Sequence, residues 1–283
     1  MKKTILVLIT ILMAVAVALS LMGDREYAAE RIFYSASKTS ARILANPDVA
    51  PPAMVAAAER DYMKVIDKYP GTNTAKAARI ALAEFQILNK KYDEALSLIN
   101  GALGSKDMDK QALALTQFLK GVAYERKGEW NRALEEFGIL RDKYIDTQLG
   151  LQVPLYIGKY YVSKDMPEKS EGAYKDAAQF YAKLENENKA KILGYAAESL
   201  LIQTYLELND YENAGNTVEA IIKDYLSPMA LSQNLPYVEL IFVDRLKKPE
   251  RAIAIYNDVI AKVKDERVKK ILQGRITKLE KKD

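Results

Sequence analysis

Apolar residues along most of the chain recur every three or four positions, which is the spacing of one face of an α-helix. From Asp24 onward the chain is rich in Ala, Leu, Lys, Glu and Tyr, and Pro and Gly fall mostly where a periodic segment ends. No alternating apolar and polar run bounded by turn residues interrupts this pattern. The sequence therefore predicts an all-α protein.

The first segment differs from the rest because it has no polar face. Lys2 and Lys3 precede an uninterrupted apolar run over residues 4–22, and the first acidic residue is Asp24. As a helix, this run would be about 28 Å long, which is close to the thickness of a bilayer hydrocarbon core. Residues 1–23 are therefore predicted to be a signal anchor that crosses the membrane once.

A cleaved signal peptide is the alternative for the same segment. Ala14-Val15-Ala16 and Ala16-Val17-Ala18 both fit the small-x-small pattern of a signal-peptidase site. In either case the basic head stays in the cytoplasm and the remaining chain is exported across the bacterial inner membrane. The protein is then predicted to be anchored with a periplasmic array, or to be free in the periplasm if the signal is cut.

The composition removes several kinds of chemistry. The chain of 283 residues contains no Cys and no His, so a disulfide, a zinc–thiolate site, a cysteine nucleophile and a histidine general base are all excluded. A chain without thiols suits an oxidising compartment. Lys and Arg number 42 and Asp and Glu number 38, and the resulting net charge of +4 says little about partners.

The clearest repeating unit combines small and aromatic residues at fixed intervals. Its members are Gly121, Tyr124, Gly128, Trp130, Ala133 and Phe137. Gly128 suits the left-handed end of a first helix, and Ala133 allows a second helix to lie close to the first. This unit resembles the tetratricopeptide repeat, a pair of antiparallel helices.

The small residue of the second helix recurs along the chain. It appears as Ala58, Ala95, Ala133, Ser170, Ala214 and Ala252, at intervals of 37, 38, 37, 44 and 38. The usual repeat has about 34 residues, so each unit here carries about one extra helical turn or a longer loop. The resemblance implies an α-solenoid, a right-handed superhelix of about five to six antiparallel helix pairs.

After the signal segment at residues 1–23, this frame predicts three further parts. Residues 24–53 are a lead-in helix and a hinge, residues 54–264 are the solenoid, and residues 265–283 are a C-terminal capping helix. The last helix is basic and has one apolar stripe, as a terminal cap requires. A contact with a membrane surface or an acidic partner is the alternative interpretation of this helix.

A search for catalytic motifs finds little. The chain has no P-loop, no dinucleotide-binding glycine motif, no nucleophile elbow and no acidic cluster with calcium-loop spacing. We therefore predict a non-enzymatic protein without metal or cofactor, with a carboxylate-based enzyme as the unlikely alternative. The basic C-terminal tail is interleaved with acids and lacks stacking aromatics, so no nucleic-acid partner is expected.

In the resembled family, the first helix of each pair lines a groove that binds a protein or peptide. Carried onto this chain, the candidate groove residues are Ile80, Glu84, Phe118, Glu125, Arg126, Leu155, Lys159, Gln203, Tyr237 and Ile241. The carboxylate clamp of cytosolic co-chaperone members needs Asn at a first-helix position that here holds Glu84, Val122, Lys159, Gln203 and Ile241. The resemblance therefore implies a groove of another specificity, whose partner the sequence does not identify.

Further motifs resemble bacterial envelope members of the family. They are Tyr69-Pro70-Gly71-Thr72 at a helix end, Ala75 and Ala78 after it, and a turn at residues 90–95. Such members include the lipoprotein of the outer-membrane β-barrel assembly machine, whose lipid-bearing Cys is missing here, and the periplasmic factor of the Tol–Pal system. The implied function is an envelope scaffold or adaptor. An ancillary factor at the protein-export or outer-membrane assembly machinery is the alternative.

Overall fold

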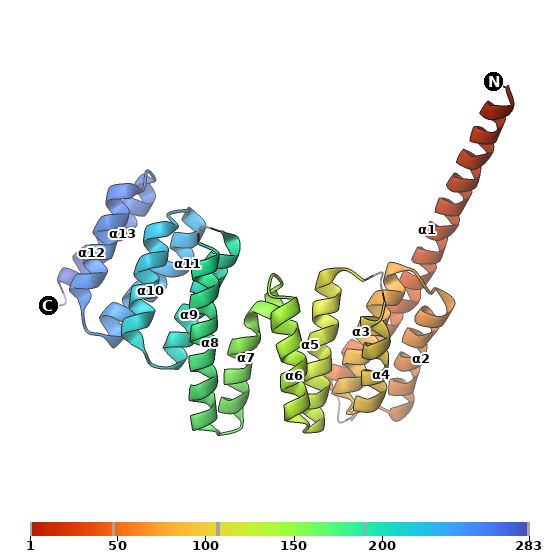
Figure 1. Ribbon diagram of the computed structural model, residues 1–283, viewed down its shortest axis with the longest axis horizontal. Coiled ribbons are helices and arrows are strands. Elements are labelled where there is room, and N and C mark those ends of the chain that lie inside the picture. Colours follow the sequence, from red (N-terminus) through yellow and green to blue (C-terminus); the bar gives the residue numbers. More distant parts are fainter. Residues whose placement is uncertain (1, 47–48, 106–107, 190, 282–283) are drawn as a thin grey trace. The chain divides into compact units, whose positions relative to one another are not determined.

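The computed structural model describes residues 2–46, 49–105, 108–189 and 191–281, with side chains from residue 23 onward. Every regular element within these ranges is helical (Figure 1). The chain divides into two compact units, residues 1–150 and residues 151–283. The all-α prediction is confirmed for the described residues.

Unit 1 consists of three consecutive helix pairs. Its helices are α1 (Lys2–Ala45), α2 (Pro52–Lys68), α3 (Asn73–Leu88), α4 (Tyr92–Leu103), α5 (Lys110–Lys127) and α6 (Trp130–Lys143). Within each pair the two helices pack together, and α2 and α4 also pack against the first helix of the next pair. The first helices contact one another as well, α1 with α3 and α3 with α5. They therefore form a row along one side of unit 1.

Unit 2 continues the same alternation. It contains most of α7 (Gln148–Ser163), then α8 (Pro167–Glu187), α9 (Ile192–Glu207), α10 (Tyr211–Asp224), α11 (Pro228–Val238), the π-helix η2 (Glu239–Arg245), α12 (Pro249–Lys262) and α13 (Glu266–Glu280). α9 pairs with α10, and α11 and η2 together form the first helix that pairs with α12. α8 packs against α9, and α10 against α11, so each pair is joined to the next.

The six small residues that define the repeat frame are all buried. Five of them, Ala58, Ala95, Ala133, Ala214 and Ala252, are 0% exposed, and Ser170 is 9% exposed. They lie in α2, α4, α6, α8, α10 and α12, the second helix of every pair. The helix-pair frame read from the sequence therefore describes how the helices of each unit pack.

Two pairs bring a glycine of the first helix against an aromatic ring of the second. A Cβ atom at Gly121 would lie 2.3 Å from Cε1 of Phe137, and one at Gly158 would lie 2.3 Å from Cε1 of Tyr174. Both rings are buried. Any side chain at either glycine would force the helices apart, because the space that it needs is already filled by the ring.

The same two frame positions hold other combinations elsewhere. Ala83 and Ile99 occupy them in the second pair, and Ile202 and Val218 occupy them in the fifth. All four side chains are at most 1% exposed. The second pair again combines a small residue with a larger one, whereas the fifth combines two β-branched residues of similar size, and both interiors are buried.

The array begins earlier than the predicted start at residue 54. The C-terminal part of α1 packs against both α2 and α3 and buries Ala29, Ala36 and Ile43. It is therefore the first helix of the first pair and not only a lead-in. Residues 47 and 48 of the predicted hinge lie outside the described residues. The interval of 44 is explained by α8, which extends to Glu187.

The predicted N-terminal anchor or signal cannot be compared with the structure. Its side chains, residues 4–22, lie outside those that the structure describes, although the backbone of α1 is continuous through them. From residue 23 onward, where side chains are described, no helical segment is both long and apolar enough to cross a bilayer. The anchor and the cleaved signal therefore both stay predictions.

Candidate partner-binding faces

The predicted groove residues of unit 1 lie on neighbouring helices of the first-helix row. Ile80 and Glu84 are on α3, and Phe118, Glu125 and Arg126 are on α5. Ile80, Phe118 and Glu125 are half-buried, whereas Glu84 and Arg126 are exposed. Since α3 contacts α5, the structure brings these residues to one surface, which we call the unit 1 first-helix face.

The centre of this face is apolar. Ile80 and Phe118 occupy the same frame position on adjacent helices. The ring of Phe118 packs at 5.8 Å between centroids on Phe137, so it is held from below while part of it meets solvent. Leu115, one turn earlier on α5, is 37% exposed, and Leu88 at the end of α3 is 49% exposed. The sequence frame missed these two leucines because it carried over only the positions known to be used in the family.

Three of the predicted residues of unit 2 also reach solvent. Lys159 on α7 is exposed, and Gln203 on α9 and Tyr237 on α11 are half-buried. Because the candidates are divided between the two units, each unit carries a face of its own.

Two predicted contact residues of unit 2 are buried in its core instead. Leu155 is 4% exposed on α7, where the Tyr181 hydroxyl of α8 donates a hydrogen bond of 2.7 Å to the carbonyl oxygen of Leu151. Ile241 is 0% exposed. Neither side chain has surface left for a partner, so these two positions are corrected to core residues.

Ile241 lies in the π-helix η2, which follows α11 directly. Within η2 the N–H of Leu246 reaches the carbonyl oxygen of Ile241, one residue further back than in an α-helix. The wider turn shifts the helical frame, so Ile241 and Phe242 both face Gly215 of α10. The prediction had assumed an unbroken α-helical period.

Hydrogen bonds hold the face of unit 2 between α9 and α11. The Tyr195 hydroxyl donates to Oε1 of Gln233 at 2.6 Å and accepts from Nδ2 of Asn234 at 3.2 Å. The Tyr195 ring also meets the Tyr225 ring edge-on, with 4.9 Å between centroids. These contacts fix the orientation of the Tyr195 ring.

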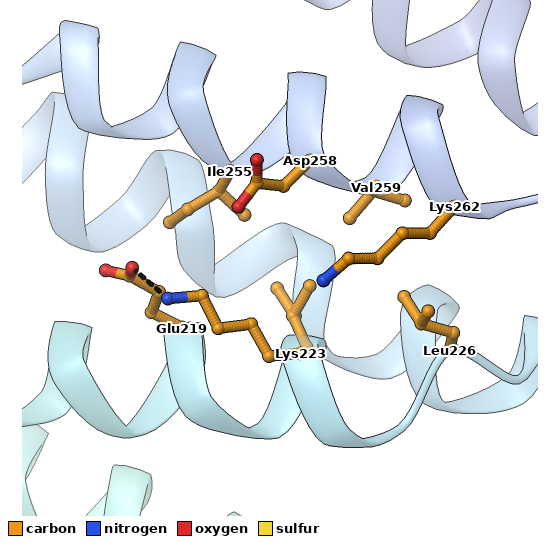
Figure 2. Close-up of a pocket in the computed structure, with 8 residues that line it drawn as sticks. Glu219, Lys223, Leu226, Ile255, Asp258, Val259 and Lys262 are labelled. Carbon is orange, nitrogen blue, oxygen red and sulfur yellow. Dashed lines mark hydrogen bonds and ion pairs between the residues drawn. The ribbon is translucent and has the colours of Figure 1, made fainter.

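A pocket between α10 and α12 has a structural rather than a ligand-binding character (Figure 2). Its walls are Ile222, Ile255 and Val259, and the Lys223 ammonium pairs with Glu219 at 2.8 Å across one end. The cavity measures about 10 Å³, which is room for about one water molecule. It is a packing gap beside an ion pair.

A larger open cleft lies between α8 and the end of α9. It measures about 430 Å³. Its lining residues include Ala178 and Ala182 of α8 and Tyr205 and Leu208 at the end of α9. The Glu171–Lys175 ion pair, 2.7 Å long, stands at its rim. This volume lies in the range of small-molecule pockets, but the two charged groups of the ion pair, Glu171 and Lys175, bind each other. Among the described residues, no three carboxylates are placed to hold a metal ion.

Glu198 of α9 is a buried carboxylate. It is 5% exposed, and its Oε2 has no hydrogen-bond partner among the described residues. Burial, followed by repulsion from Glu185 of α8 and Asp224 of α10, raises its pKa to about 7, although Lys189 opposes the shift. A charge at the junction of three helices therefore titrates near neutral pH.

Comparisons with known proteins do not assign this chain to a family. No family model matches the chain, and no curated protein matches it. A tetratricopeptide repeat protein from Parabacteroides merdae ATCC 43184 aligns at 15% identity over 88% of this chain and 87% of that chain, with a TM-score of 0.36. BtubC (BKLC) from P. vanneervenii aligns at 20% identity over 87% and 93%, with a TM-score of 0.39. With scores this low, neither likeness carries an argument about this chain.

We predict that Glu198→Gln stabilises unit 2 above neutral pH. The pKa of Glu198 in the folded state, about 7, exceeds the ordinary value of 4.5, so ionisation of this carboxylate opposes folding. The loss of folding free energy grows from pH 4.5 to about pH 7 and is complete above that. The variant should gain about 2–3 kcal/mol at alkaline pH and nothing below the ordinary value. Urea unfolding followed by hydrogen exchange in α9 measures this gain. Asp176→Asn, an exposed change on α8, is the control. An equal gain at every pH would contradict the prediction.

Proposed function

We propose that this protein is a non-enzymatic scaffold that binds a protein or peptide partner along the first-helix faces of its repeats. The observation that carries the proposal is the row of α1, α3 and α5, because it joins residues from separate helix pairs into one surface. Ile80, Leu115 and Phe118 give that surface an apolar centre.

The packing beneath the face favours binding. Phe118 is braced by Phe137, and Phe137 is 0% exposed. A partner that covers Phe118 therefore gains apolar contact without first ordering a mobile side chain. Exposed charges at Glu84 and Arg126 border the apolar centre and supply the polar rim that protein interfaces commonly have.

Site-specific photocrosslinking in intact cells tests this proposal. A photoreactive residue at Glu84 or at Leu115 should give one discrete adduct with a protein partner. Asp67, exposed on the second helix α2, is the matched control and should give none. Phe118→Ala should weaken the adduct by at least tenfold, since buried aromatic anchors commonly contribute more than 1.4 kcal/mol. Adducts of equal yield from both faces, or from neither, would contradict the proposal.

The finer proposal is that this scaffold works in the bacterial envelope, with the remaining chain exported. Lys2, Lys3 and the apolar run at residues 4–22 support it. An anchor there would be rigidly joined to the array. Glu26 accepts hydrogen bonds from the Thr74 and Asn73 amides at 2.8 and 3.1 Å, so it ties α1 to the start of α3. The alternative is an ancillary factor at the export or outer-membrane assembly machinery. This alternative depends on the N-terminal segment remaining as a membrane anchor.

We expect the intact chain to stay in membranes washed with alkaline carbonate. An uncharged, mostly apolar run of nineteen residues is long enough to hold a helix in the bilayer if the chain is not cut. Mass spectrometry of the washed membranes should find the N-terminal residues still attached. A soluble form that begins after Ala16 or Ala18 would overturn the anchor, and an uncut soluble form would overturn export altogether.

A further inference from the structure

The positive charge of this protein is concentrated at its C-terminal end. Residues 262–283 hold nine Lys or Arg and four Asp or Glu, a net charge of +5, whereas the whole chain carries +4. The rest of the chain together therefore carries −1. An electrostatic partner of opposite sign would meet this end of the molecule first.

One side of α13 is attached to unit 2. Leu272 and Leu279 are 0% and 5% exposed and belong to the apolar core that α10, α11, η2 and α12 share. The Arg275 guanidinium adds an ion pair of 2.9 Å to Glu239 of η2. These contacts hold α13 in place and decide which of its sides points outward.

The outward side of α13 is a basic stripe. Arg267, Lys270, Ile271, Lys278 and Lys281 recur at helical spacing and are all exposed, with Ile271 at 58%. The stripe is about 21 Å long at about 1.5 Å per residue. The stripe itself contains no acidic residue, although Glu266 and Glu280 are exposed beside it.

Two of the three described acids around the stripe are paired, and exposed Glu280, next to Lys281, has no ion pair within 4 Å to another described residue. Asp265 pairs with Arg267 at 3.1 Å, and Glu266 pairs with Lys269 at 2.7 Å. No ion pair within 4 Å joins Lys270, Lys278 or Lys281 to another described residue. Three cations of the stripe are thus available to a partner.

We propose that this face of α13 docks on an anionic lipid bilayer. A straight row of cations on a helix suits a flat charged surface, and Ile271 lies among these cations, where it can enter the headgroup region. Gly274 lies at the middle of the stripe and has no side chain that would project from it. The space beside it is open, since no atom lies within 4 Å of where its Cβ would be. The apolar area is small, so electrostatic attraction supplies most of the binding.

The absence of Cys makes a direct test simple. Gly274→Cys in the full chain accepts an environment-sensitive fluorophore at the centre of the stripe. The label should brighten and shift to the blue with vesicles of phosphatidylcholine and phosphatidylglycerol, but not with phosphatidylcholine alone. The apolar N-terminal run meets both kinds of vesicle, so the difference reports α13. High salt should reverse the change. Ile192→Cys, 90% exposed on α9, is the control label and should not respond.

Charge removal completes the experiment. Each cation near an anionic surface contributes about fivefold in binding, so Lys270→Gln with Lys278→Gln should weaken the response about 30-fold. Lys64→Gln with Lys68→Gln on α2 removes the same charge elsewhere and should leave it unchanged. An equal response to neutral vesicles, an equal loss in both double variants, or a response only to an acidic protein would overturn the proposal.

Discussion

The fold depends on a limit to how closely two helices can cross. Where the helices of a pair meet, the space holds one large side chain and one small one, as Phe137 and Tyr174 show against Gly121 and Gly158. Short helices of this kind cannot bury their apolar sides alone, so each pair also needs its neighbours. The size match at the crossing limits the distance within a pair, and in unit 1 successive first helices also contact each other, α1 with α3 and α3 with α5.

Polar contacts then join successive elements without adding to the core. Glu26 caps the start of α3, and Lys91 pairs with Glu59 of α2 at 2.8 Å. In unit 2, Arg251 pairs with Glu219 at 3.1 Å and lies 4.5 Å from the centre of the Phe242 ring. The Glu26 contact joins two first helices, α1 and α3, whereas Glu59 and Glu219 lie on second helices. Charged side chains also occupy the first-helix faces, as Glu84, Arg126 and Lys159 show.

Much of this architecture could be predicted from the sequence, because small residues at a crossing leave a regular trace. The frame through Ala95, Ala133 and Ala214 placed every second helix. It failed where a feature has no periodic signal. Ile241 lies in the core within the π-helix η2, which the helical period does not predict. The prolines after α1 suggested a break there, although α1 packs as the first helix of the first pair. The burial of Glu198 has no sequence signal either, since it depends on α8 and α10, which only the folded chain brings together.

A double-mutant cycle at Gly121 and Phe137 tests the size match most directly. Gly121→Leu alone should destabilise α5 and α6 by about 1–3 kcal/mol through overpacking, and Phe137→Ala alone by about 3–5 kcal/mol through a cavity. With both changes the leucine fills the space that the ring leaves, so the combined loss measured by hydrogen exchange in α6 should fall short of the sum by about 1–3 kcal/mol. Strictly additive losses would show that the two residues do not share one space, and the account of the fold would be wrong.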